Sequence, residues 1–185
     1  MNRLEESLKD APVVKKGEYS YVIHPITDGI PEIKPDLLEE VGDELYRLIK
    51  NKPSFDKIVT LEAMGIPLAS VLSLKTGKPF TIIRKRSYGL PEEISVEQMT
   101  GYSKSRLFIN GLKKDDRVVL VDDVLSTGGS LRAVLSAFKK IGVKVVGVLI
   151  AVNKGNAAED IIEEFDADID VLVDIDVVDE EVVIK

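Results

Sequence analysis

The sequence predicts an α/β fold with an open parallel (doubly wound) sheet flanked by helices. Short, nearly continuous apolar runs recur along the chain, which is typical of strands buried on both faces. Segments with apolar residues at helical spacing lie between these runs. The 185 residues show no internal repeat and are enough to bury one core. We therefore expect one domain over residues 1–185.

Five apolar runs predict the strands of the sheet. The first four are continuous enough for buried strands, whereas the fifth alternates and should be less buried. They span residues 57–61, 79–83, 117–121, 145–152 and 169–175.

Two segments show the apolar face of an amphipathic helix. They cover residues 37–49 and 131–141, where leucine, valine, isoleucine and phenylalanine recur at helical spacing. Pro35 and Asp36 suit the start of the first helix, because proline tolerates the first turn and an acid favours the positive end of the helix dipole.

Three segments fall outside this repeat. Residues 1–34 predict a short helix, a strand near 19–24 and a connection rich in glycine and proline. The tail at 176–185 ends in a small strand. Both pieces are too small to be domains, so we expect them to join as a cap, or hood, at one edge. Residues 85–104 show no clear periodicity, which predicts a mobile loop that is either a lid or disordered.

Composition excludes several kinds of chemistry. The chain has no cysteine and one histidine, His24, which excludes zinc sites of the Cys/His type, disulfides and thiol catalysis. The net charge of -7 argues against nucleic acid as a partner. No apolar run reaches the length of a membrane span, and the first ten residues lack a signal core. We expect a cytoplasmic protein without a membrane partner, and we assign no role to His24.

The segment DDVLSTGGS, after the third predicted strand, carries the strongest chemical signal. Residues 126–130 would present backbone N–H groups and hydroxyls at a helix N-terminus, which suits a phosphate. Gly128 and Gly129 allow close approach of the backbone. Asp122 and Asp123 would repel phosphate, so they suit ribose hydroxyls or magnesium. A solvated turn is the alternative, but strand, acid pair, turn and helix in this order indicate a phosphorylated sugar.

Three motifs resemble the type I phosphoribosyltransferases. VVLVDDVLSTGGS resembles their signature for phosphoribosyl pyrophosphate (PRPP), and LEAMGIP is similar to their pyrophosphate loop. RKRSYGLPEEISVEQMTGYSKSRLFI is similar to the mobile loop of the adenine and xanthine members. The resemblance covers nearly the whole chain and is strongest to the archaeal hypoxanthine (hypoxanthine/guanine) members. It implies the type I phosphoribosyltransferase fold with a hood, and a homodimer.

The resemblance assigns the parts of PRPP to groups of residues. Asp122 and Asp123 would hold the ribose hydroxyls. The 5-phosphate would lie on Ser126, Thr127, Gly128, Gly129 and Ser130. Pyrophosphate would contact Ala63, Met64, Gly65, Arg84 and Lys85, and the lid would contribute Tyr102 and Lys104. Magnesium (Mg²⁺) would arrive with PRPP near the acid pair, without an assigned protein ligand.

The purine base is expected to lie among Lys154, Val152 and Ile30. The Lys154 ammonium can donate to the 6-oxo group of hypoxanthine or guanine but is ill matched to the amino group of adenine. A solvated loop lysine is the alternative, and Ile30 could equally be core. Where the main hypoxanthine-guanine enzymes carry an aspartate, this chain has Ser126, which leaves the identity of the general base open. Gly101 stands where the adenine enzymes of similar loop pattern carry a glutamate, which argues against adenine as the substrate.

These assignments imply a purine-salvage transferase. Hypoxanthine, and also guanine, would react with PRPP to give the monophosphate IMP or GMP and pyrophosphate. An adenine or xanthine transferase of the same fold and a non-catalytic PRPP-binding regulator are the alternatives. The preference between hypoxanthine and guanine stays open.

Overall fold

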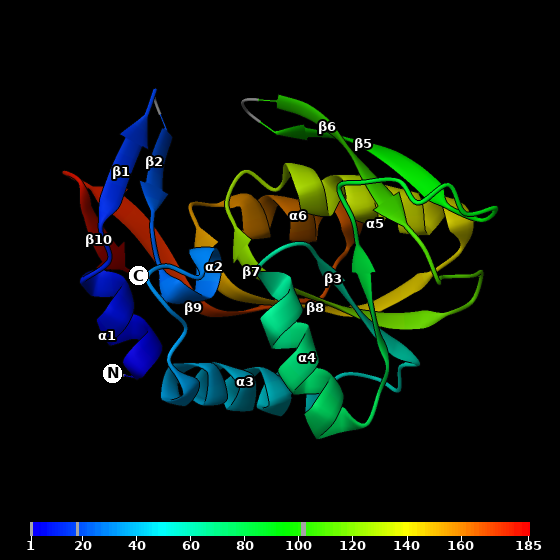
Figure 1. The fold of residues 1–185 in the computed structure, drawn as a ribbon, viewed down its shortest axis with the longest axis horizontal. Helices are drawn as coiled ribbons and strands as arrows, with labels where there is room; N and C mark the ends of the chain where they lie inside the picture. The colour runs from blue at the N-terminus through cyan, green and yellow to red at the C-terminus, as the bar shows by residue number, and fades with distance from the viewer. Residues whose placement is uncertain (1, 18, 101–102) are drawn as a thin grey trace.

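A central sheet organises the chain in the computed structural model, which describes residues 2–17, 19–100 and 103–185, with the backbone alone at 99, 100, 103 and 104. The strand order is β10-β9-β8-β7-β3-β4 (Figure 1). Neighbouring strands are parallel except β10 and β9. The strands are β3 (Lys57–Leu61), β4 (Phe80–Ile83), β7 (Arg117–Leu125), β8 (Lys144–Lys154), β9 (Ile169–Val178) and β10 (Glu181–Ile184). The predicted open parallel sheet is confirmed.

Helices cover both faces of this sheet. They are α1 (Arg3–Lys9), α2 (Pro25–Asp28), α3 (Pro35–Lys50), α4 (Gly65–Thr76), α5 (Gly129–Ile141) and α6 (Ala157–Phe165). The two helices with predicted ranges, α3 and α5, match them closely. Among the described residues, no helix combines the length and the apolar character that crossing a bilayer requires.

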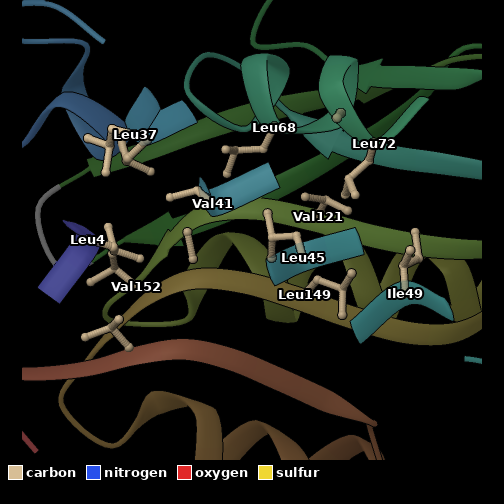
Figure 2. Close-up of a cluster of buried hydrophobic side chains, with 14 of the residues drawn as sticks. Leu4, Leu37, Val41, Leu45, Ile49, Leu68, Leu72, Val121, Leu149 and Val152 are labelled. Atoms are coloured by element: carbon tan, nitrogen blue, oxygen red, sulfur yellow. The ribbon is translucent and has the colours of Figure 1, made fainter. Parts of the chain in front are cut away.

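The alternation of side chains along β7 divides the core into two layers. Val119 and Val121 pack in one layer with the buried residues of α3 and α4, such as Leu45 (Figure 2). Val118 and Leu120 point to the opposite face, where α5 and α6 cover them. Because neighbouring residues of a strand face opposite sides, a continuous apolar run is what a strand with helices on both faces requires.

The two chain ends meet at one edge of the sheet. Strands β1 (Val13–Lys16) and β2 (Tyr19–Val22) form a separate hairpin. Helix α1 packs against β10 (Figure 1), and an ion pair of 2.7 Å joins the Lys15 ammonium to the Glu180 carboxylate. We call residues 2–34 and 176–185 the hood.

The expected irregular loop at 85–104 differs from the structure over its second half. Strands β5 (Ile94–Thr100) and β6 (Ser103–Ile109) form an antiparallel hairpin, and β5 lies against α5 (Figure 1). Leu107 and Ile109 are buried, whereas Ser95 and Glu97 are exposed. The alternation is short and interrupted by polar residues, so periodicity alone did not reveal it; packing on α5 stabilises it.

Candidate active site

The polar segments that follow β3 and β7 and that end β8 lie at one edge of the sheet. These strands are parallel and adjacent, so their carboxyl ends meet there. In open α/β sheets this edge forms the ligand crevice. The fold therefore brings together residues that are up to about a hundred positions apart in the chain.

The acid pair lies within β7, because this strand continues past the predicted end at Val121 to Leu125 by pairing with β8. Asp123 is only 8% exposed and Asp122 is half-buried. Burial raises the pKa of both carboxyl groups, and the charge of Asp122 raises the pKa of Asp123 further. Hydrogen-bond donors or a cation would relieve this unfavourable pair, so its chemistry fits ribose hydroxyls or magnesium.

The predicted phosphate turn directly precedes α5, which begins at Gly129. Gly128 has a φ of +74°, and a Cβ there would stand 2.5 Å from Nη1 of Arg132. That same Nη1 donates to the Thr127 carbonyl oxygen at 2.9 Å, which fixes the turn. A cavity of about 140 Å³ is lined by the whole turn from Ser126 to Ser130, so all five predicted residues face one space at a helix N-terminus.

The expected pyrophosphate loop joins β3 to α4 and lies against the acid pair. Ala63 and Met64 precede the helix, Gly65 is its first residue, and the peptide bond between Glu62 and Ala63 is cis. A Cβ on Gly65 would stand 2.7 Å from Oδ1 of Asp122. Only glycine therefore allows this loop to approach the carboxylate so closely.

The two basic residues after β4 are anchored by Glu62. The Arg84 guanidinium lies 3.0 Å from a Glu62 carboxylate oxygen, and the Lys85 backbone N–H donates to the other oxygen. The Lys85 ammonium acts on Asp122, whose pKa its positive charge lowers against the larger effect of burial. The sequence analysis assigned no role to Glu62, although this residue directly follows the predicted strand at 57–61 and belongs to the motif LEAMGIP. Tyr102 and the side chain of Lys104 lie outside the described residues.

A second cavity of about 210 Å³ lies between the hood and the sheet. Its lining includes Val152 and Lys154 from β8, Val124 from β7, and Tyr19, Tyr21 and Asp28 from the hood. The Lys154 ammonium stands 3.9 Å from the centre of the Tyr19 ring and donates to the Ser20 carbonyl oxygen. Ile30 is 55% exposed and does not line this cavity. The hood residues were missed because only the fold places them opposite Lys154.

Tyr19 connects this cavity with the phosphate turn. Its hydroxyl lies 2.5 Å from Oγ of Ser126, and its ring packs edge-on against Tyr21 with centres 4.5 Å apart. The two cavities are therefore neighbouring parts of one site.

His24 lies at the start of α2 and serves the structure of the hood. Its Nδ1 accepts from the Ile26 backbone N–H at 3.2 Å, so the proton is on Nε2, which donates to Oγ of Ser7 at 2.8 Å. Burial lowers the pKa of the imidazole to about 4, against a smaller opposing effect of Asp28. A neutral His24 thus joins α2 to α1.

The open parallel sheet carries an acid pair, a glycine-rich turn at a helix N-terminus and an adjoining cavity at its carboxyl edge, which is the arrangement of an α/β protein that binds ligands at this edge. The model of the phosphoribosyl transferase domain matches residues 32–179, and the chain belongs to this family.

Curated relatives extend the likeness over the full chain. A hypoxanthine/guanine phosphoribosyltransferase of Methanothermobacter marburgensis is 51% identical over 186 residues, covering 100% of this chain and 96% of the relative. That of Methanocaldococcus infernus is 52% identical over 183 residues, covering 99% and 100%. The adenine phosphoribosyltransferase structure from Thermoanaerobacter pseudethanolicus has a TM-score of 0.76 at 22% identity, covers 92% and 99%, and shares the fold.

Proposed function

We propose that this chain is a purine-salvage phosphoribosyltransferase that converts hypoxanthine or guanine, with PRPP, to IMP or GMP and pyrophosphate. One observation carries the proposal: the acid pair, the phosphate turn and the cavity of Lys154 lie side by side at one sheet edge. Relatives about 50% identical over the full chain carry the matching name.

In the part of the site that binds PRPP, each group of residues matches the charge or the hydrogen-bonding groups of one part of the substrate. The 5-phosphate lies on the turn at 126–130, where backbone N–H groups and the helix dipole favour an anion. The ribose hydroxyls donate to Asp122 and Asp123, which fixes the anomeric carbon between the two cavities. The loop at 63–65 and Lys85 hold the leaving pyrophosphate, whose negative charge grows as the bond breaks.

Magnesium is the expected cofactor, and the oxygen ligands of Asp122 and Asp123 suit it. When bound with PRPP it neutralises charge on the pyrophosphate. Among the described residues, no group of three or more histidine, cysteine or carboxylate side chains could hold a metal alone. Substrate oxygens would therefore complete its coordination.

The base lies in the cavity beside Lys154, which donates to its 6-oxo oxygen. Val124 and Val152 supply apolar contact for the ring. Adenine presents an amino group where the ammonium needs an acceptor, so we expect it to be a poor substrate.

A panel of bases tests this function. Purified protein is incubated with PRPP, magnesium and one base at a time, and the nucleoside monophosphate is measured. We expect product with hypoxanthine or guanine and little with adenine. Failure with every 6-oxopurine would overturn the proposal, and PRPP binding without any turnover would favour a regulator.

We also propose that the chain is a homodimer, as the family resemblance implies. Sedimentation velocity of the purified protein tests it, and a monomer at assay concentrations would contradict it.

A further inference from the structure

We propose that Asp28 determines base specificity: its carboxylate accepts the N1–H of a 6-oxopurine whose O6 receives a hydrogen bond from Lys154. The inference rests on the proposed function and adds a residue from the hood to the base site. The proposed role of Asp28 also predicts which 6-oxopurines bind: guanine and hypoxanthine should bind, and xanthine should not.

Asp28 and Lys154 reach the same cavity from different parts of the fold. Asp28 is the last residue of α2 in the hood, and Lys154 is the last residue of β8 in the sheet. A flat ligand between hood and sheet therefore meets a donor from one and an acceptor from the other. Apolar Val124 and Val152 line the space beside them.

The Asp28 carboxylate is held in place by one of its two oxygens. Oδ2 accepts from the His24 backbone N–H at 3.0 Å and from the Thr27 hydroxyl at 2.6 Å. Within the described part of the chain, no donor reaches Oδ1. A carboxylate has acceptor sites on both oxygens, so the second oxygen is available to a ligand.

Asp28 also lies near the acid pair of the sheet. Its negative charge contributes to the raised pKa of Asp123, whose larger causes are burial and Asp122, so carboxylates from hood and sheet face the same region. Like charges that meet at a cleft are typical of functional sites. A bound base would place donor groups between these carboxylates.

The donor and acceptor pattern of the purine decides which base fits. A 6-oxopurine presents an acceptor at O6 beside a donor at N1, whereas adenine presents a donor at its amino group beside an acceptor at N1. An ammonium donates only and a carboxylate accepts only, so Lys154 and Asp28 match the first pattern and oppose the second. Guanine offers a second donor, its 2-amino group, but xanthine places an oxygen there and would be repelled.

The variant Asp28→Asn tests the proposal, because the amide has nearly the same shape but carries a donor as well as an acceptor. We expect kcat/KM for guanine to fall by about 10- to 100-fold, the value of one charge-assisted hydrogen bond. The amide can donate to the 2-oxo group of xanthine, so the ratio of xanthine to guanine turnover should rise by at least about 10-fold. The KM for PRPP should stay unchanged.

The matched control is Asp10→Asn, which makes the same change at an exposed carboxylate of the hood that does not line the cavity. It should leave the ratio of xanthine to guanine turnover as in the wild type. If Asp28→Asn lowers turnover of all bases by one factor, with the ratio unchanged, Asp28 only supports the hood and the proposal is wrong. If Asp28→Asn does not fold, competition of GMP and xanthosine monophosphate with the wild type gives the second measurement. Equal inhibition would contradict the proposal.

Failure of the proposed function has a different outcome. In that case the wild-type protein itself would show no turnover of guanine or hypoxanthine, and no variant would be needed to see it.

Discussion

The burial of His24 predicts how much this residue contributes to the change in the free energy of unfolding with pH. The imidazole is 1% exposed, and its Nδ1 faces the Ile26 backbone N–H, so protonation there would replace a hydrogen bond by two opposed donors. Burial lowers the pKa of His24 from 6.5 to about 4. Between these values His24 binds a proton in the unfolded chain but not in the folded chain, so this group lowers the free energy of unfolding as pH falls.

The size of this effect follows from the two pKa values. Each pKa unit corresponds to about 1.4 kcal/mol, so His24 contributes about 3 kcal/mol that is present above pH 6.5 and lost by pH 4. About 2 kcal/mol of it is lost between pH 7 and pH 5. Taken alone, a loss of this size corresponds to a drop of about 4–8 °C in the melting temperature of a domain of this length.

Comparison with His24→Asn isolates this effect. Asparagine can still cap α2 but does not titrate, so the variant loses the contact with Ser7 while its stability depends less on pH. Asp122 and Asp123 act in the opposite direction, because their raised pKa values favour the folded state on acidification. Both proteins keep that pair, so it cancels in the difference. Urea unfolding at pH 7, 6 and 5 should give a difference in stability that shrinks by about 2 kcal/mol. Parallel stability curves would refute the reasoning.

Three further predictions concern the site. Gly65→Ala would place a Cβ 2.1 Å from Oγ1 of Thr60 and 2.7 Å from Oδ1 of Asp122, so we expect a loss of about 1–3 kcal/mol in stability and a raised KM for PRPP. Thermal melts and PRPP kinetics check this, and unchanged values would contradict the close approach. Lys154→Ala should lower kcat/KM for 6-oxopurines by about 10- to 100-fold with little change in PRPP binding; equal loss of both would remove its assigned role. Chelation of magnesium should abolish turnover, and its return should restore it; activity that persists in chelator would exclude the cofactor.

The elements of the sheet were predictable because each carries its own local signal. The run at 57–61 coincides with β3, and α3 begins at the predicted Pro35. Helix α4 gave no such signal: Leu68 and Leu72 are buried but Leu74, on the same short helix, is 87% exposed, so no clean apolar face marks its bounds. Local patterns identify elements, whereas tertiary packing decides ambiguous ones.

The residues of the candidate site also fall into those with a local sequence signal and those that only tertiary packing brings to the site. Residues at strand ends, such as Asp122 and Lys154, could be predicted as candidates because a parallel sheet gathers those ends at one edge. Tyr19 and Asp28 were not predicted, since only the docking of the hood places them beside residues more than 90 positions away. Ile30 was expected beside the base on the same hood segment, but the turn after α2 leaves it exposed.

The proposed site would also explain how a protein of net charge -7 selects an anionic substrate. Exposed charges beyond about 8–10 Å are largely screened at physiological salt, so groups in contact with the ligand decide binding. In the proposed function the turn at 126–130 attracts a phosphate, but so would the same turn on many proteins. The buried acid pair adds the selection: a bare phosphate would leave Asp122 and Asp123 with neither donors nor a cation. A ribose with free hydroxyls, carrying magnesium on its pyrophosphate, would supply both. In the proposed function, the two carboxylates are therefore the groups that would distinguish PRPP from simpler phosphates.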